Sequence, residues 1–191
     1  MRLPLTCLSV LVVFSLNACR TPRANVVAET APVAPPPPLY NWNGDKVSGP
    51  LKVRIDLSEQ KAQIFKGKEN VGWTYVATGV AARPTPTGSF SVLEKIADKS
   101  SNRFGVIVNA DGEVINSDAT NGVSKIPEGG KFVGAKMPHW MRLTSYGVGM
   151  HAGYIPHPGS TASHGCIRLP AYIAEKLYEN AVLGTSVSII P

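Results

Sequence analysis

Apolar and polar residues alternate along residues 51–75, and no other pattern in the chain restricts the possible folds as strongly. In the stretch LKVRIDLSEQKAQIFKGKENVGWTY, apolar side chains recur at every second position in three successive runs, which Gly67 and the pair Glu69-Asn70 separate. A period of two places successive side chains on opposite faces of a β-strand, whereas an amphipathic helix needs apolar residues three and four positions apart. The stretch therefore predicts a β-meander.

Further strands are predicted along the rest of the chain. The turn Pro86-Thr87-Gly88 leads into a strand, and Asp111-Gly112 marks a hairpin within FGVIVNADGEVINS. MRLTSYGVGMHAG predicts one short strand, and TSVSII predicts a closing strand. Residues 117–139 contain Gly, Pro and Lys without a clear period, so this segment is either a lid over a site or a tolerated insertion.

Only the segment after Pro170 has a convincing helical pattern. Pro170 suits the first helical position, and Gly184 stands where a terminating glycine is expected. One apolar face repeats at helical spacing and consists of Ile173, Ala174, Leu177, Tyr178 and Ala181. We therefore expect a mostly β domain with one helix near its C-terminus.

The first 18 residues have the pattern of a secretory signal peptide. Arg2 precedes an apolar run that is too short to span a bilayer as a mature helix. The sequence Leu16-Asn17-Ala18-Cys19 resembles the lipobox of bacterial lipoproteins, in which cleavage occurs before the cysteine and that cysteine is acylated. We expect a lipid anchor on Cys19; the alternative is a simple cleaved signal that ends near Ala18.

Residues 19–46 are expected to tether a folded domain, residues 47–191, to a membrane. TPRANVVAETAPVAPPPP is polar and rich in proline, so it cannot form a core and favours an extended chain. A disordered leader of no consequence is the alternative. A lipoprotein of this kind belongs in the bacterial periplasm, and Arg20 in place of an aspartate favours the outer membrane.

The net charge of +6 does not indicate a nucleic-acid partner. The basic residues are scattered along the chain and form no run, although the calculated pI is about 9.3. Nucleic-acid binding domains cluster basic residues on one face and add stacking aromatic residues. We interpret the charge as a solvated surface.

The segment HAGYIPHPGSTASHGCIRLP holds three of the four histidines and one of the three cysteines. Cys7 leaves with the signal and Cys19 takes the lipid, so Cys166 is the one thiol that the mature domain keeps. A buried structural cysteine is one reading of such a thiol. A thiol attacks a carbonyl as thiolate, however, and two histidines near Cys166 offer a base. Gly165 permits a tight turn that turns backbone N–H groups toward one point, as an oxyanion hole requires.

These residues also carry a family resemblance. MHAG followed by SHGCIRLP resembles the L,D-transpeptidase catalytic domain, or YkuD domain, whose signature is a histidine, a spacer, Ser or Thr, His-Gly-Cys, an apolar residue and Asn or Arg. Residues 163–168 match this signature without a gap, and the resemblance extends over about residues 47–191. It implies a mostly β, sandwich-like domain that cross-links bacterial peptidoglycan.

The resemblance implies a role for each residue near the thiol. Cys166 is the nucleophile and His151 the general base, with His164 as the rival base. A backbone carbonyl just after the base orients it in this family, which implies Ala152 or Gly153, although many members have Gly followed by Ser or Thr there. The remaining assignments are oxyanion-hole N–H groups at Gly165 and Cys166, a structural or substrate-side hydrogen bond at His164, a structural ion pair or a substrate carboxylate at Arg168, a turn-stabilising hydroxyl at Ser163, and solvent exposure at His157.

The implied reaction is acyl exchange on a peptidoglycan stem tetrapeptide without a metal or an organic cofactor. The thiolate of Cys166 attacks the amide before the terminal D-alanine, and an amine from a second stem resolves the thioester to give a 3-3 cross-link. Three alternatives stay open: an L,D-carboxypeptidase or other hydrolase on the same nucleophile, a non-catalytic peptidoglycan-binding lipoprotein, and a metal site. The last is disfavoured because the spacing of His151, His157, His164 and Cys166 matches no common zinc pattern.

Overall fold

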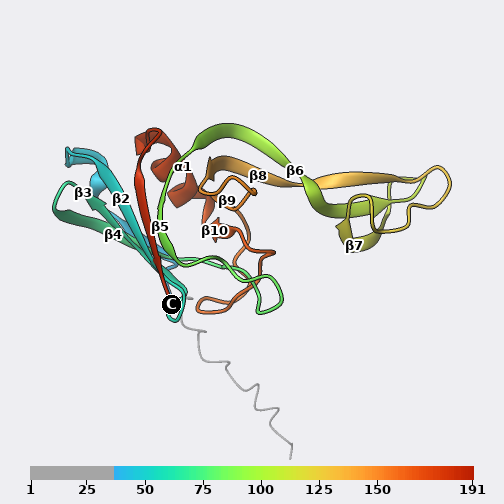
Figure 1. The fold of residues 1–191 in the computed structure, drawn as a ribbon, viewed down its shortest axis with the longest axis horizontal. Coiled ribbons are helices and arrows are strands. Elements are labelled where there is room, and N and C mark those ends of the chain that lie inside the picture. The colour runs from blue at the N-terminus through green and yellow to red at the C-terminus, as the bar shows by residue number, and fades with distance from the viewer. Residues whose placement is uncertain (1–36) are drawn as a thin grey trace, which may run out of the picture. The chain divides into compact units, whose positions relative to one another are not determined.

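The computed structural model describes residues 37–191, which form two β-sheets and one α-helix (Figure 1). This architecture confirms the expectation of a mostly β domain with a helix near its C-terminus. The predicted signal peptide, Cys19 and most of the predicted tether lie outside the described residues. No helix within residues 37–191 is long and apolar enough to cross a membrane.

The first sheet has six strands in the order β1-β4-β3-β2-β11-β5. The predicted meander forms its centre, with antiparallel pairing of β2 to β3 and of β3 to β4. The closing strand β11 lies parallel to β2 and antiparallel to β5. The bounds are β1 Tyr40–Trp42, β2 Leu51–Asp56, β3 Lys61–Lys66, β4 Glu69–Tyr75, β5 Gly88–Ser91 and β11 Ser186–Ile190.

The second sheet has five strands in the order β10-β9-β8-β6-β7. The outer parts of β6 and β8, together with β7, extend from the body as a long arm, residues 101–136 (Figure 1). The short strands β9 and β10 lie parallel at the opposite edge of the sheet. The bounds are β6 Glu94–Val108, β7 Val114–Thr120, β8 Lys131–Arg142, β9 Gly149–Ala152 and β10 Ile167–Leu169.

The folded part begins earlier than the predicted boundary at residue 47. β1 pairs with β4, and the short 3-10 helix Gly44–Lys46 follows it. The Lys66 ammonium donates a hydrogen bond of 2.7 Å to the carbonyl of Gly44, which ties this helix to β3. The last part of the predicted tether is therefore part of the sheet, because its backbone satisfies the edge of β4.

Residues 117–139 are neither a loop lid nor an unstructured insertion. They contain the end of β7, a turn and most of β8, and the predicted hairpin at Asp111-Gly112 joins β6 to β7. Both faces of the arm are largely exposed, so its strands need no apolar alternation. Irregularities in the pairing of β6 with β7 and β8 disturb the period further.

Two further boundaries differ from the sequence prediction. The segment MRLTSYGVGMHAG is the end of β8, a tight turn and β9 rather than one strand, and Gly147 in the turn has φ +96°. The helix α1 spans Ala171–Asn180 with Pro170 just before it. Gly184 does not terminate the helix but belongs to a following turn, with φ +90°.

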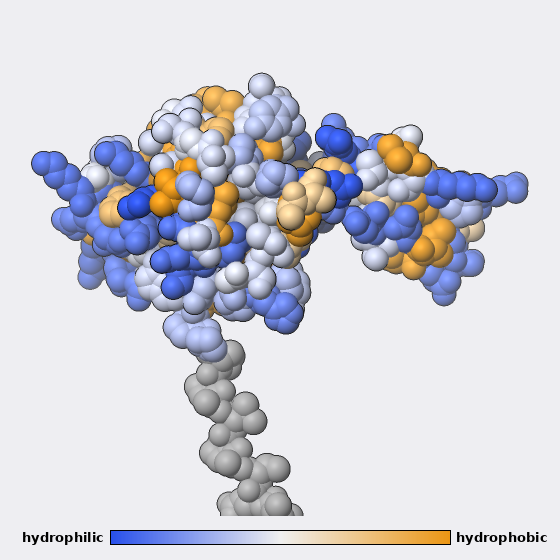
Figure 2. Space-filling model, turned by 60° about the horizontal axis from the view of Figure 1, so that its bottom comes forward, coloured by the Kyte–Doolittle hydropathy of each residue, from blue (hydrophilic) through white to orange (hydrophobic). Residues whose placement is uncertain are grey.

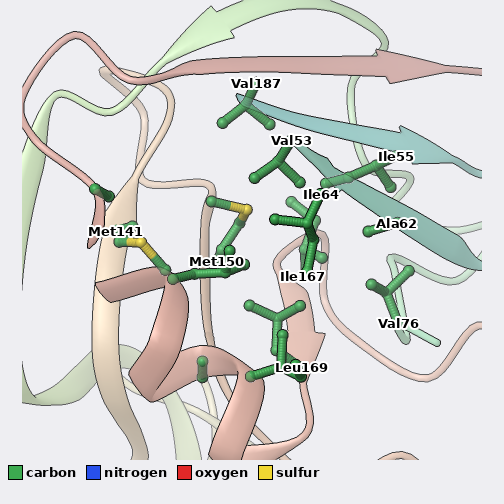
Figure 3. Packing of buried hydrophobic residues seen from close by; sticks show 14 of the residues in the cluster. Val53, Ile55, Ala62, Ile64, Val76, Met141, Met150, Ile167, Leu169 and Val187 are labelled. Atoms are coloured by element: carbon green, nitrogen blue, oxygen red, sulfur yellow. The ribbon is translucent and has the colours of Figure 1, made fainter. Parts of the chain in front are cut away.

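The hydrophobic core lies where the meander, β11, α1 and the β8–β10 edge of the second sheet meet (Figure 3). Ile64, Met150, Ile167 and Leu177 are fully buried there. Burying each such side chain stabilises the fold by about 1.5–3 kcal/mol relative to leaving it exposed. Because β9 and β10 each contribute core residues, this packing also fixes the two strands that border the loop of residues 153–166, which ends at Cys166.

The arm differs from the body in its surface. Figure 2 shows hydrophobic patches on it, and five of its aliphatic side chains are 40–80% exposed. These side chains are Val114, Ile115, Val123, Ile126 and Val133.

Candidate active site

The parallel pairing of β9 and β10 brings the histidine and the cysteine of the motif to one edge of the second sheet. Ile167 is in register with Met150, and both side chains face the core. Arg168 is in register with His151 on the opposite face. Cys166 directly precedes β10, so its side chain shares that opposite face through the alternation of the strand.

His151 is buried and has a defined tautomer. Its Nδ1 lies 2.8 Å from the carbonyl oxygen of Ala152, which can only accept, so Nδ1 carries the hydrogen. Of the two carbonyls considered from the sequence, Ala152 rather than Gly153 makes this contact. Burial lowers the pKa of His151, while the Ala152 carbonyl raises it and the charge of Arg168 lowers it further. The imidazole is therefore neutral near pH 7, with a lone pair on Nε2.

Cys166 is half-buried at the start of β10. Its sulfur lies 3.9 Å from the carbonyl oxygen of Gly147 in the turn before β9. Burial raises the pKa of the thiol, and the Gly149 N–H and the charge of Arg168 lower it in part. The thiol is therefore protonated near pH 7 and needs a base when it attacks.

Ser163 folds the loop that precedes Cys166. Its hydroxyl donates to the carbonyl of Cys166 at 2.5 Å and accepts the N–H of Gly165 at 3.1 Å. The turn-stabilising role foreseen for Ser163 matches this geometry. The same contact corrects the expectation for Gly165, because an N–H that is bonded to Ser163 is not free for an oxyanion. The N–H of Cys166 donates to no group among residues 37–191.

Arg168 forms no ion pair with any carboxylate in the described part of the chain, which contradicts the favoured reading of a structural ion pair. Its backbone instead forms two hydrogen bonds with Ala77, at 3.0 and 3.1 Å. The aliphatic part of its side chain packs over Gly153, where a Cβ would lie 2.9 Å from the Arg168 Cγ. Its positive charge lowers the pKa of both Cys166 and His151.

Of the other two histidines in the motif region, His164 contacts residues of the arm and His157 is exposed. The Nε2 of His164 lies 3.1 Å from Oδ1 of Asp118 in β7, and its ring lies 4.4 Å from the ring of Phe104 in β6. The arm therefore contacts the catalytic loop through His164. His157 is exposed in the segment between β9 and β10, as expected. Within residues 37–191, no three His, Cys, Asp or Glu side chains form a group that could hold a metal ion.

Sequence reasoning missed the segment around residues 77–85, which contacts the loop that precedes Cys166. Gly79 and Thr85 contact Gly165, and Gln60 holds Thr78 through three hydrogen bonds of 2.7–3.0 Å. These residues precede the motif by about 80 positions or more, and nothing in their local pattern distinguishes them from turn residues. The only signal was the sequence TPTG, which was interpreted as a turn leading into a strand.

Solved structures of L,D-transpeptidases have a similar fold. The structure from Mycobacterium smegmatis has a TM-score of 0.58 at 21% identity, and the alignment covers 74% of this chain and 59% of that one. A mutant of the Enterococcus faecium enzyme has a TM-score of 0.56 at 23% identity, and the alignment covers 75% of this chain and 50% of that one. LdtMt1 in complex with imipenem has a TM-score of 0.55 at 21% identity, and the alignment covers 73% of this chain and 58% of that one. At these identities the similarity concerns the fold alone.

The present chain spans between half and three fifths of the length of those structures. A comparison with curated protein sequences finds no match. The family profile described as the L,D-transpeptidase catalytic domain, YkuD, matches residues 50–189, which include both sheets and the catalytic loop. The chain therefore belongs to the L,D-transpeptidase catalytic domain (YkuD) family.

Proposed function

We propose that the chain is an L,D-transpeptidase that cross-links peptidoglycan stem peptides through a thioester on Cys166. The observation that carries the proposal is the placement of His151 and Cys166 on one face of the paired strands β9 and β10, with Nδ1 of His151 held by Ala152. This arrangement leaves Nε2 as the basic atom on the face that also carries the protonated thiol. Family membership supports the reaction class.

In the acylation half, the substrate is a stem tetrapeptide whose third residue is linked to a terminal D-alanine. The sulfur of Cys166 forms a bond to the carbonyl carbon of that third residue while Nε2 of His151 takes the thiol proton. The carbonyl oxygen becomes an oxyanion, and the Cys166 N–H is the donor available to it. The carbon–nitrogen bond then breaks, and D-alanine leaves with the proton from His151.

In the second half, an amine on the side chain of a neighbouring stem attacks the thioester. His151 accepts a proton from the amine, the carbon–sulfur bond breaks, and the proton returns to the thiol of Cys166. The product is a 3-3 cross-link, and water in place of the amine would yield a tripeptide. One amide replaces another, so the exchange needs no nucleotide, metal or organic cofactor.

Product analysis tests this proposal. The purified chain and its Cys166→Ala variant are incubated with a disaccharide-tetrapeptide, and the products are separated and weighed by mass spectrometry. We expect a cross-linked dimer and free D-alanine from the wild type alone. Tripeptide without dimer would support the hydrolase instead, and no product from either protein would leave a peptidoglycan-binding protein.

We also propose that acylation of Cys19 anchors the chain to a membrane facing the periplasm, with the outer membrane favoured. The support is the sequence Leu16-Asn17-Ala18-Cys19 and the residue Arg20 after it. Replacing Cys19 with Ala should move the protein from the membrane fraction to the soluble fraction and abolish labelling by a radioactive fatty acid. Unchanged labelling of Cys19→Ala would contradict the anchor.

A further inference from the structure

The peptide between Gly165 and Cys166 has a fixed orientation, and Thr85 is the side chain that fixes it. The Thr85 hydroxyl donates to the carbonyl oxygen of Gly165 at 2.8 Å. The two residues are 80 positions apart in the chain, and Thr85 is only 4% exposed. No peptide bond in the described residues is cis, so the Cys166 N–H points away from the Gly165 carbonyl.

The direction of the Thr85 hydroxyl follows from its second partner. The N–H of Gly79 donates to the same oxygen at 2.9 Å. Because a hydroxyl has one hydrogen, an oxygen that accepts from Gly79 has that hydrogen left for the Gly165 carbonyl. Thr85 therefore bridges two backbone groups at a buried position, where a polar group left without a partner is costly.

Close backbone contact makes this bridge rigid. A Cβ on Gly79 would lie 2.9 Å from the Cα of Gly165 and 2.1 Å from the carbonyl oxygen of Arg83. Gly165 itself has φ +110°, which favours glycine. The loop at Gly79 and the catalytic loop are thus in direct contact, with Thr85 between their polar groups.

The same segment holds both ends of the catalytic loop. Val80 donates to the carbonyl of Ser163 at 3.0 Å, and Ala77 exchanges two hydrogen bonds with Arg168. The ends of the loop at residues 163 and 168 are therefore fixed by backbone. In its centre the Ser163 hydroxyl holds the N–H of Gly165 and the carbonyl of Cys166, and Thr85 is the side chain bonded to the peptide between these two residues. Loss of the Thr85 hydroxyl would remove the hydrogen bond that orients this one peptide without releasing the ends of the loop.

We propose that Thr85 is a positioning residue that aims the Cys166 N–H at the oxyanion formed during acylation. The inference rests on the proposed L,D-transpeptidase reaction. If the Gly165 carbonyl is not held, the peptide can rotate and the N–H no longer points at the developing charge. Removing one oxyanion-hole donor costs on the order of 10²–10³ in kcat in a well-studied protease.

The test compares Thr85→Val, which removes the hydroxyl at similar volume, with Thr85→Ser, which keeps it. The matched control is Thr87→Val, because Thr87 is exposed in the same turn. D-alanine release from a disaccharide-tetrapeptide gives kcat and KM. We expect kcat of Thr85→Val to fall tenfold or more with KM little changed, and Thr85→Ser and Thr87→Val to stay near wild type.

Alkylation by iodoacetamide separates positioning of the oxyanion from placement of the thiol. In this reaction the thiolate attacks the saturated carbon of iodoacetamide and no oxyanion forms. We therefore expect the rate of alkylation of Cys166 in Thr85→Val to equal the wild-type rate. The rate is read from the peptide that contains Cys166, since Cys7 and Cys19 also carry thiols.

Several outcomes would overturn the inference. The first is a kcat of Thr85→Val equal to that of the wild type, and the second is an equal loss of the alkylation and acylation rates in Thr85→Val. The third is a kcat of Thr85→Ser as low as that of Thr85→Val. The fourth is unfolding of both Thr85→Val and the smaller variant Thr85→Ala, which would show that Thr85 is needed for the fold. Failure of the proposed function gives a different result, because the wild type itself would then release no D-alanine, or would release it without forming a cross-linked dimer.

Discussion

At Cys166 and His151, burial keeps both groups neutral. It raises the pKa of the thiol and lowers the pKa of the imidazole. A preformed thiolate–imidazolium pair would need both shifts in the opposite direction. The resting site therefore holds a protonated thiol and a neutral imidazole, and in the proposed reaction the proton moves only when the sulfur attacks.

The raised pKa of the Cys166 thiol predicts that its alkylation rate keeps rising to unusually high pH. The thiolate of Cys166 forms at higher pH than that of an ordinary cysteine, so its rate of reaction with iodoacetamide should still rise above pH 8.5, about the ordinary thiol pKa. A short cysteine peptide under the same conditions is the control. A rate at Cys166 that levels off near pH 7, read from its own tryptic peptide, would mean that the ion pair exists.

The lowered pKa of His151 predicts the acid limb of activity. The base works only when neutral, and burial keeps it neutral to lower pH than a free imidazole. We therefore expect kcat/KM for D-alanine release to fall only below pH 6.5, about the ordinary imidazole pKa. An acid limb above that value would show that a different group, or a charged His151, governs the reaction.

Among the elements, strands that bury one face were predictable from their period, whereas strands exposed on both faces were predictable only where a turn marked them. The alternation from Leu51 to Tyr75 predicted β2, β3 and β4, and the apolar face around Leu177 predicted α1. In the arm, the hairpin between β6 and β7 was predicted from its turn, whereas the outer part of β8 was missed because its side chains face solvent on both sides. β1 was missed because three residues beside a proline run show no period, and its stability comes from hydrogen bonds to β4.

Contact between β7 and the catalytic loop leads to a prediction about His164. Burial is the main cause of the lowered pKa of His164, and the charge of Asp118 raises it in part. Asp118→Asn removes that charge, so the pKa of His164 should fall further, as measured by an NMR titration of its ring protons. Stability near pH 7 should change by less than about 1 kcal/mol, because the lowered pKa leaves His164 mostly uncharged there and Asp118 is exposed.

The exposed residue Glu128 provides a matched control, because it lies on the same arm and makes no contact with His164. Glu128→Gln should leave the titration of His164 unchanged. A pKa of His164 that rises in Asp118→Asn, or that changes equally in both variants, would contradict the contact between β7 and the loop.

For the whole molecule, the motif pointed to candidate reacting groups but not to the residues that hold them. The sequence HGC and an upstream histidine suggested Cys166 and His151, because residue types that can react are recognisable when they lie close together in the sequence. The supports come from Ala77, Gly79 and Thr85 in the segment beside β10, and such contacts depend on the folding of both sheets. The ion pair expected for Arg168 does not form among residues 37–191, and this residue holds the end of the loop through backbone hydrogen bonds with Ala77 instead.

The measurement that tests the central claim most directly is the intact mass of the purified chain during reaction with a disaccharide-tetrapeptide that lacks a free acceptor amine. We predict that the wild type gains the mass of the substrate minus D-alanine, on the peptide that contains Cys166, and that Cys166→Ala gains nothing. An equal gain in both proteins, or product formation by Cys166→Ala, would contradict a thioester on Cys166.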